Sequence, residues 1–273
     1  MFANPRYQLY TDASNTGWGA HFEGCNTSGT WSVEESSYHI NVKEMVAVLF
    51  GLQSLLPHDL HHITLKLLID NTSVVNILRN MGSSHSTLLN KYNRDVWLWA
   101  KARDIWLLPV YVSSTQNLAD KPSREICIDA EWQLAPSVFQ QVLTTLDFLP
   151  TIDLFASRLN FQLPRFVSFQ PDPLAFETDA FSIDWTDLLF YAFPPFSCIS
   201  RCLQKIKADN ACGVMVVPKW PTQPYFPVIL KMARRIMHIP ASPTNLLMPN
   251  QPNLVSDIAM RTQFLACLIF GRC

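Results

Sequence analysis

Four acidic residues stand at positions from which a folded chain could bring carboxylates together: Asp12, Glu44, Asp70 and Asp120. Converging carboxylates are the oxygen ligands that Mg²⁺ prefers. Without a cation they repel one another, so such a cluster is hard to explain by packing alone. Taken singly, each acid has an ordinary explanation: Asp12 could be an exposed or turn-capping side chain, and Glu44 could cap a helix.

The stretch around Asp12 predicts a hairpin, in which an acid is a poor strand former. Apolar residues flank a polar turn at residues 14–17, which supplies the residue types that a chain reversal needs. Over residues 6–35 we expect three short strands, with a second break at residues 25–29.

The segments that follow place the next two acids beside periodic apolar residues. Asn41 is expected to cap a helix whose apolar stripe ends before Pro57, with Glu44 at the capping-box position on the edge of the buried face. Residues 62–70 predict a buried strand that ends at Asp70.

The remaining elements of this half alternate between helix and strand. Helices are expected from Asn71 onward and over about residues 87–103. A strand over 105–112 contains Pro109, which favours an edge position, and a short helix then carries Asp120 in its first turn.

This order predicts an α/β fold in which an antiparallel hairpin system is fused to parallel strands in a mixed five-stranded sheet. In such sheets, sites form beyond the carboxyl ends of the parallel strands. Asp12 and Asp70 should lie near that edge if their strands are neighbours.

Two motifs carry a resemblance to a known family. Residues 10–20 read Tyr-Thr-Asp-Ala-Ser-x-x-Gly-Trp-Gly-Ala, and residues 119–124 read Ala-Asp-x-x-Ser-Arg. With the Ile-Asp-Asn-Thr segment at 69–72, they resemble the ribonuclease H domain of retroelement reverse transcriptases, and most of all that of DIRS-type retrotransposons. The resemblance covers essentially the whole chain and implies a ribonuclease H-like fold for its first part.

The resemblance implies a metal-dependent endoribonuclease that cleaves the RNA strand of RNA–DNA hybrids. Two Mg²⁺ ions, or Mn²⁺ in their place, would be held by the four acids: Asp12 would bridge both ions, Glu44 and Asp70 would bind one, and Asp120 the other. The hybrid would be recognised by its shape and its ribose 2′-hydroxyls. No Tyr-x-Asp-Asp polymerase motif is present, so the chain looks like a piece of a polyprotein whose polymerase domain acts in cis or in trans.

Three polar residues beside the acids are candidate substrate contacts: Ser14, Asn15 and Asn71. Turn or helix capping explains each of them equally well. The chain also departs from the family: the loop at residues 111–117 is about one residue shorter and lacks the usual histidine, and Pro122 replaces a leucine. These departures support an alternative, a catalytically dead remnant that binds nucleic acid or serves as a structural spacer. A generic endonuclease of the same superfold that acts on DNA is a weaker alternative.

The second half resembles phage-type N6-adenine methyltransferases. We therefore expect a ribonuclease H-like domain over 1–124, a connector over 125–150 with one helix, and a second α/β domain over 151–273. Phe193 precedes the Pro-Pro-aromatic segment where methyltransferases place a hydrogen-bonding residue, and no glycine-rich loop is present. We expect this domain to be degenerate and without methyl-transfer activity.

Composition limits the remaining possibilities. The chain has 273 residues and a net charge of −1, so any nucleic acid must bind locally and without a global basic surface. Its seven cysteines lack a repeated spacing, which argues against a disulfide framework and for a reducing compartment. No N-terminal signal pattern is found, and the apolar run at 264–270 is too short to span a bilayer. We expect a soluble intracellular protein, in the cytoplasm or the nucleus.

Overall fold

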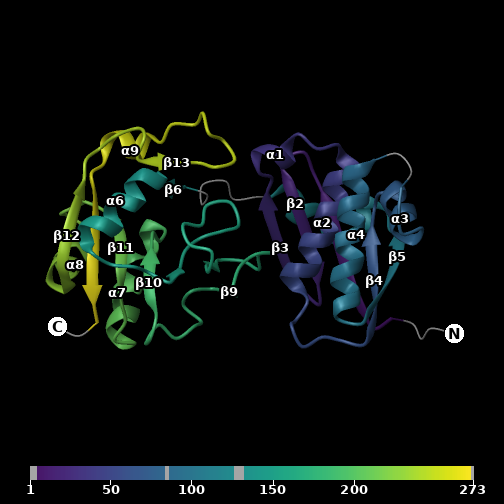
Figure 1. The fold of residues 1–273 in the computed structure, drawn as a ribbon, viewed down its shortest axis with the longest axis horizontal. Helices are drawn as coiled ribbons and strands as arrows, with labels where there is room; N and C mark the ends of the chain where they lie inside the picture. Colours follow the sequence, from purple (N-terminus) through teal and green to yellow (C-terminus); the bar gives the residue numbers. More distant parts are fainter. Residues whose placement is uncertain (1–4, 84–85, 126–131, 272–273) are drawn as a thin grey trace. The chain divides into compact units, whose positions relative to one another are not determined.

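The computed structural model describes residues 5–83, 86–125 and 132–271 (Figure 1). The chain forms two compact units, one comprising residues 1–128 with 170–174 and the other comprising 129–169 with 175–273. Within the described residues, none of the helices combines the length and the apolar composition needed to cross a membrane.

The first unit is built on one five-stranded sheet with the order β3-β2-β1-β4-β5. Its strands are β1 (Tyr7–Ala13), β2 (Gly17–Phe22), β3 (Cys25–Thr30), β4 (Ile63–Ile69) and β5 (Ile105–Tyr111). The first three pair antiparallel, whereas β4 lies parallel to both β1 and β5. The expected mixed five-stranded sheet is therefore confirmed, and β5, with Pro109, lies at its edge.

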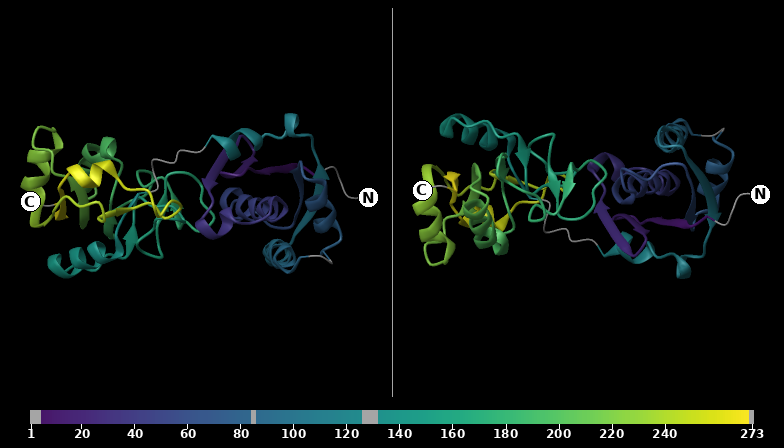
Figure 2. Two further views of the ribbon diagram at one scale, coloured as in Figure 1. Left: turned by 90° about the horizontal axis from the view of Figure 1, so that it is seen from above. Right: turned by 90° about the horizontal axis from the view of Figure 1, so that it is seen from below.

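Among the described residues, the helical segments that accompany this sheet are α1 (Val33–Ser36), α2 (Ile40–Leu55), α3 (Thr72–Arg79), α4 (Thr87–Ala102), η1 (Ser114–Gln116) and α5 (Asp120–Arg124). The long helices α2 and α4 lie on one face, and the short α5 lies on the opposite face beside β2 (Figure 2). The core between sheet and helices includes Leu9, Met45, Leu52 and Leu67, all fully buried.

Two glycines allow helices to pack closely against β2, one on each face of the sheet. A Cβ atom added at Gly51 of α2 would lie 3.0 Å from Ala20 Cβ, so the absence of a side chain brings α2 close to the sheet. A Cβ at Gly19 would lie 2.5 Å from the backbone nitrogen of Ser123 in α5, on the other face. Successive strand residues point to opposite faces, so β2 is packed tightly on both.

Two local predictions were wrong. Residues 25–29, predicted as a break, belong to β3, and the turn is at Glu23 and Gly24, whose φ angles are +47° and +83°. The polar residues of β3 resemble a loop in sequence, but pairing with β2 at the sheet edge satisfies one side of this strand. The helix N-cap is His39 in place of Asn41, so the capping-box position falls on Val42 and Glu44 has no capping role.

The elements around the last two acids form as predicted. Asp70 follows β4 directly, and Asn71 caps α3 by accepting bonds from the backbone nitrogens of Ser73 and Val74. Asp120 is the first residue of α5. Pro122 is the third residue of this helix, where a backbone N–H would have no helical partner, so its missing donor costs no hydrogen bond.

The second unit is also α/β. Its sheet has the order β12-β14-β11-β10-β7, in which β7, β10 and β11 are parallel and β14 and β12 are antiparallel additions. The strands are β7 (Ile152–Asp153), β10 (Leu189–Ala192), β11 (Cys212–Pro218), β12 (Ala233–Ile239) and β14 (Phe264–Phe270). Two short strand pairs form separate two-stranded sheets. They are β6 (Gln133–Leu134) with β13 (Leu246–Leu247), and β8 (Val167–Ser168) with β9 (Glu177–Thr178).

The helical segments of this unit are α6 (Pro136–Leu146), η3 (Phe196–Cys198), α7 (Ile199–Ala208), α8 (Tyr225–Met232) and α9 (Asp257–Arg261). The helix expected in the connector is α6, and its Phe139 ring packs edge-on against Tyr191 of β10 with the centroids 4.8 Å apart. Residues 126–131 of the predicted connector lie outside the described residues.

Candidate active site

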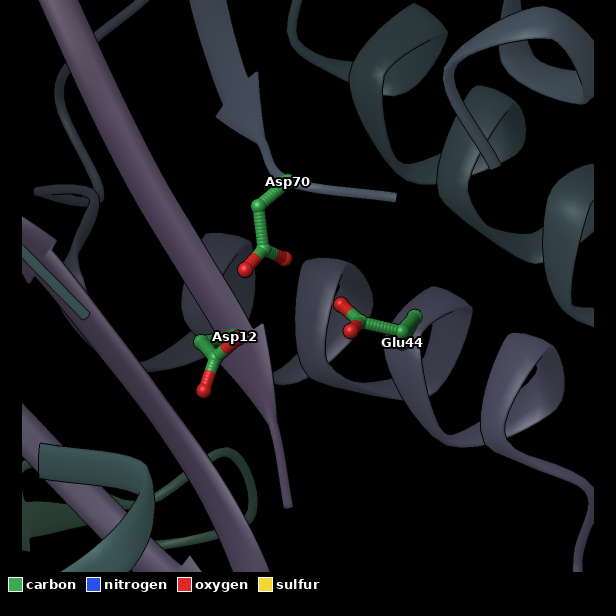
Figure 3. A group of neighbouring side chains, drawn as sticks. All are labelled: Asp12, Glu44 and Asp70. Carbon is green, nitrogen blue, oxygen red and sulfur yellow. The ribbon is translucent and has the colours of Figure 1, made fainter. Parts of the chain in front are cut away.

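Three of the four predicted acids converge at one edge of the first sheet. Ligand oxygens of Asp12, Glu44 and Asp70 all lie within 4.8 Å of one another (Figure 3). Asp12 comes from β1, Asp70 from the end of β4 and Glu44 from α2. Figure 3 shows the carboxylates turned toward a common space between these elements.

Strand register and helix packing produce this arrangement. β1 and β4 are parallel with Thr11 opposite Ile69, so the next residue of each chain segment emerges at the same sheet edge. The close approach of α2 at Gly51 brings Glu44 against that edge. Asp12 and Glu44 are each only 4% exposed, whereas Asp70 is half-buried.

The electrostatics of the cluster favour protonation or a bound cation. Burial raises the pKa of Glu44 to about 9, helped by the charges of Asp12 and Asp70, and a hydrogen bond with the Ala13 backbone opposes the shift. Burial likewise raises the pKa of Asp12 to about 6, against the opposing effect of a hydrogen bond from Ser123.

The donor set fits a hard divalent cation. The Oε2 atom of Glu44 is buried and has no hydrogen-bond partner, although carboxylate oxygens at such depth are normally paired. Three carboxylates around one point supply the oxygen ligands that Mg²⁺ or Mn²⁺ takes. A cation there would pair the free oxygen and neutralise the mutual repulsion of the acids.

Asp120 lies outside this three-acid group. Its Oδ1 accepts a bond from Arg124 at 2.7 Å, one turn along α5. Its charge still raises the pKa of Asp12, so it lies close to the cluster. Asp120 therefore lies beside the three-acid group, and its carboxylate is already paired with a basic side chain of the same helix.

Two functional contacts were not predicted from the sequence. Ser123 donates its hydroxyl to Asp12 Oδ2 at 2.5 Å, and Ser114 donates its hydroxyl to Asp70 Oδ2 at 2.7 Å. Ser123 belongs to the Ala-Asp-x-x-Ser-Arg motif, so its proximity to an acid of the site could have been suspected from the sequence. Ser114 lies in the loop that lacks the histidine, where no motif points to it.

The predicted substrate contacts have structural partners. The hydroxyl of Ser14 donates to the Ser123 carbonyl at 2.8 Å, and Asn71 both caps α3 and donates to Asn41 Oδ1 at 2.9 Å. Asn15 is exposed, and its carbonyl accepts a bond from Lys43 at 3.4 Å. Capping and tethering thus account for Ser14 and Asn71, and a substrate role for all three stays a prediction.

In the second unit, Asp153 ends β7 and is buried. Its carboxylate accepts backbone bonds from Phe155 at 3.3 Å and Gln162 at 3.0 Å, so it caps the loop that follows. Burial raises its pKa to about 7. Phe193 packs edge-on against Phe264, with the ring centroids 6.0 Å apart.

Comparison with known proteins gave matches among solved structures only. No family model matches the chain, and no curated protein matches it. Ribonuclease H1 from the halophilic archaeon Halobacterium salinarum NRC-1 is 18% identical over 42% of this chain and 92% of its own, with a TM-score of 0.36.

Two further solved structures match a similar share of this chain. The N-terminal ribonuclease H domain of rv2228c from Mycobacterium tuberculosis is 16% identical, covering 44% of this chain and 91% of that chain, with a TM-score of 0.37. LC11-RNase H1 in complex with an RNA/DNA hybrid is 17% identical, covering 43% of this chain and 93% of that chain, with a TM-score of 0.37.

Proposed function

We propose that the first unit is a metal-dependent endoribonuclease of the ribonuclease H type, which cleaves the RNA strand of RNA–DNA hybrids. One observation carries the proposal: the oxygens of Asp12, Glu44 and Asp70 meet within 4.8 Å although they come from three separate elements. The sequence motifs at residues 10–20 and 119–124, which contain the first and the last acid of the set, support the same assignment.

Bound divalent cations supply an activated water and a stabilised leaving oxyanion, with two ions about 4 Å apart in sites of this kind. We assign Mg²⁺ to the site, with Mn²⁺ as the alternative. Asp12, Glu44 and Asp70 would hold the first cation, and Asp12 would share the second with Asp120. Arg124 occupies Oδ1 of Asp120, so Asp120 would bind the cation through its other oxygen or after this ion pair opens.

The wider context is part of the proposal. The motif at 10–20 supports an origin in a DIRS-type retrotransposon polyprotein, with a reverse transcriptase polymerase domain acting in cis or in trans. For the second unit we propose a degenerate adenine-methyltransferase-like domain following a connector. Its three parallel strands are compatible with that proposal.

The alternative is a cleavage-dead remnant that binds nucleic acid. Two observations favour it: Asp120 is paired with Arg124, and the loop before α5 contains no histidine. Such a protein would bind hybrids and leave both strands intact.

Cleavage of a hybrid with labelled strands, with Mg²⁺, Mn²⁺ or a chelator, tests the two functions on the full chain. We expect cation-dependent cleavage of the RNA strand only, and no cleavage of duplex DNA or single-stranded RNA. Asp70→Asn should abolish it, whereas Asp59→Asn should not, because Asp59 is an exposed acid outside the cluster. Hybrid binding without cleavage under either cation would establish the remnant instead.

A further inference from the structure

We infer that Ser123 is a positioning residue, whose hydroxyl holds the Asp12 carboxylate in the orientation that binds divalent cations. This inference rests on the proposed function, since it assigns a role within the same site. In this inference α5 has two roles: it carries Asp120, and it places the Ser123 hydroxyl against Asp12.

The contact between the two side chains is short and buried. Ser123 is 0% exposed and Asp12 is 4% exposed, and Ser123 Oγ lies 2.5 Å from Asp12 Oδ2. The same hydroxyl lies 2.9 Å from the carbonyl oxygen of Asp120. A hydroxyl has one proton, and a carboxylate is a stronger acceptor than a carbonyl, so the proton is directed to Asp12.

Separate contacts fix α5 and the segment just before it relative to β1, β2 and the turn between them. Ser14 donates its hydroxyl to the Ser123 carbonyl at 2.8 Å, and Asn117 donates its side-chain amide to the Thr11 carbonyl at 3.0 Å. At Gly19 the helix backbone comes so close that a Cβ atom would lie 2.5 Å from the Ser123 nitrogen. The contacts at Thr11 and Ser14 flank Asp12 in sequence, and Gly19 lies opposite Asp12 on β2. Together they leave the Ser123 hydroxyl little freedom to move away from Asp12.

The consequence concerns the acid cluster. Asp12 is buried beside Glu44 and Asp70, and the negative charges of Asp70 and Asp120 act against its ionised carboxylate. A donor fixed on one of its oxygens opposes rotation away from Glu44 and Asp70 and leaves the other oxygen for a cation. Hydrogen bonds of this kind to metal ligands orient the ligand, and their loss typically costs about 10- to 100-fold in metal affinity.

The test compares Ser123→Ala with the wild-type full chain by titration calorimetry with Mn²⁺ and by the rise in Tm on adding Mg²⁺. Neither readout requires cleavage. We expect Ser123→Ala to bind Mn²⁺ about 10- to 100-fold more weakly and to lose most of the Mg²⁺-induced rise in Tm. Ser36→Ala is the matched control, because Ser36 also donates to the carbonyl three residues before it, at 2.7 Å, but is an exposed residue of α1 outside the group of Asp12, Glu44 and Asp70.

A purely structural role for Ser123 predicts a different result: a lower Tm in the chelator and an unchanged rise with Mg²⁺. That result, or wild-type Mn²⁺ affinity in Ser123→Ala, would overturn the inference. If the alanine variant does not fold, Ser123→Cys, which keeps the shape of the side chain with a somewhat larger atom and a weaker donor, decides on the same criteria. A wild-type chain that binds neither cation would instead refute the proposed function.

Discussion

The guanidinium of Arg124 lies 2.7 Å from Asp120 Oδ1, so an acid assigned to the second cation is bound to a positive charge one turn further along its own helix. Both side chains reach solvent, Arg124 more than Asp120. The charge of Arg124 also lowers the pKa of Asp12. Arg124 therefore competes with a cation for the acidic groups at this corner of the site.

Arg124→Gln should lower the Mg²⁺ concentration that gives half-maximal cleavage, by up to about fivefold, because an exposed ion pair is worth at most about 1 kcal/mol. The measurement is a Mg²⁺ titration of the cleavage rate at saturating hybrid. Lys121→Gln is the control, since Lys121 pairs with Glu125 on the same helix at 3.6 Å. An unchanged or higher Mg²⁺ requirement would show that Arg124 does not compete.

Asp70→Asn should reduce hybrid cleavage by at least about 100-fold, because one carboxylate of the oxygen ligand set is lost. In the presence of a chelator its Tm should be unchanged or slightly raised, because a charge that raises the pKa of Glu44 and of Asp12 is removed. Thermal unfolding and gel-based cleavage assays measure the two effects. A variant that keeps full Mg²⁺-dependent activity would remove Asp70 from the ligand set.

The stability of the metal-free protein should fall as the pH rises from about 5 to about 9. Glu44 has a pKa of about 9 in the folded state against 4.5 for the free side chain, so over this range the folded state holds a proton that the unfolded state has lost. Unfolding releases that proton, so each unit of pH lowers the free energy of unfolding; Asp12 adds to the loss up to its pKa of about 6.

Denaturant unfolding in a chelator at several pH values measures this slope. Glu44→Gln should flatten it, whereas Glu34→Gln, at an exposed residue of α1, should leave it unchanged. Equal slopes in wild type and Glu44→Gln would show that Glu44 titrates normally.

A histidine in the loop between β5 and α5 should raise turnover more than hybrid affinity. Ser114 in this loop reaches Asp70, so the neighbouring exposed Thr115 is a suitable position for Thr115→His. A grafted proton-transfer group should give about a 10-fold rise in kcat, below the 10²–10⁴-fold of well-positioned groups. Single-turnover and steady-state assays separate the two parameters, and a change in KM alone would contradict the expectation.

The full chain should neither bind S-adenosylmethionine nor methylate adenine. Phe193 has no side-chain acceptor for an amino group, and it is packed against Phe264. A buried amine without a partner costs about 1–3 kcal/mol, and poor alignment costs more. Calorimetry with the cofactor and transfer of a labelled methyl group to DNA test this. Micromolar binding together with transfer would refute it.

The sequence predicted those parts of the site that depend on strand ends. Asp70 follows an apolar strand, and Asp12 lies at the same edge because β1 and β4 are parallel neighbours; this adjacency was a condition of the prediction, and the structure meets it. The N-cap of α2 was not predictable, because His39 is an uncommon capping residue and Asn41 is a better one by propensity.

The contact between Ser123 and Asp12 could not be predicted because it depends on packing. It joins two residues that are 111 positions apart in the sequence, and it requires α5 to approach β2 closely at Gly19. The pairing of Asp120 with Arg124 had a signal, the i,i+4 spacing, but the sequence does not say which partner an acid prefers when a cation competes.

The strand order of the first sheet also bears on how this unit folds. The hairpins from β1 to β3 join residues that are close in sequence. The parallel pairing of β1 with β4 joins residues far apart in sequence, such as Thr11 and Ile69, with α2 in the intervening chain. Asp70 therefore meets Asp12 only through the non-local pairing of β4 with β1. A chain in which β4 is unpaired has no assembled acid cluster, so the proposed activity depends on this non-local pairing.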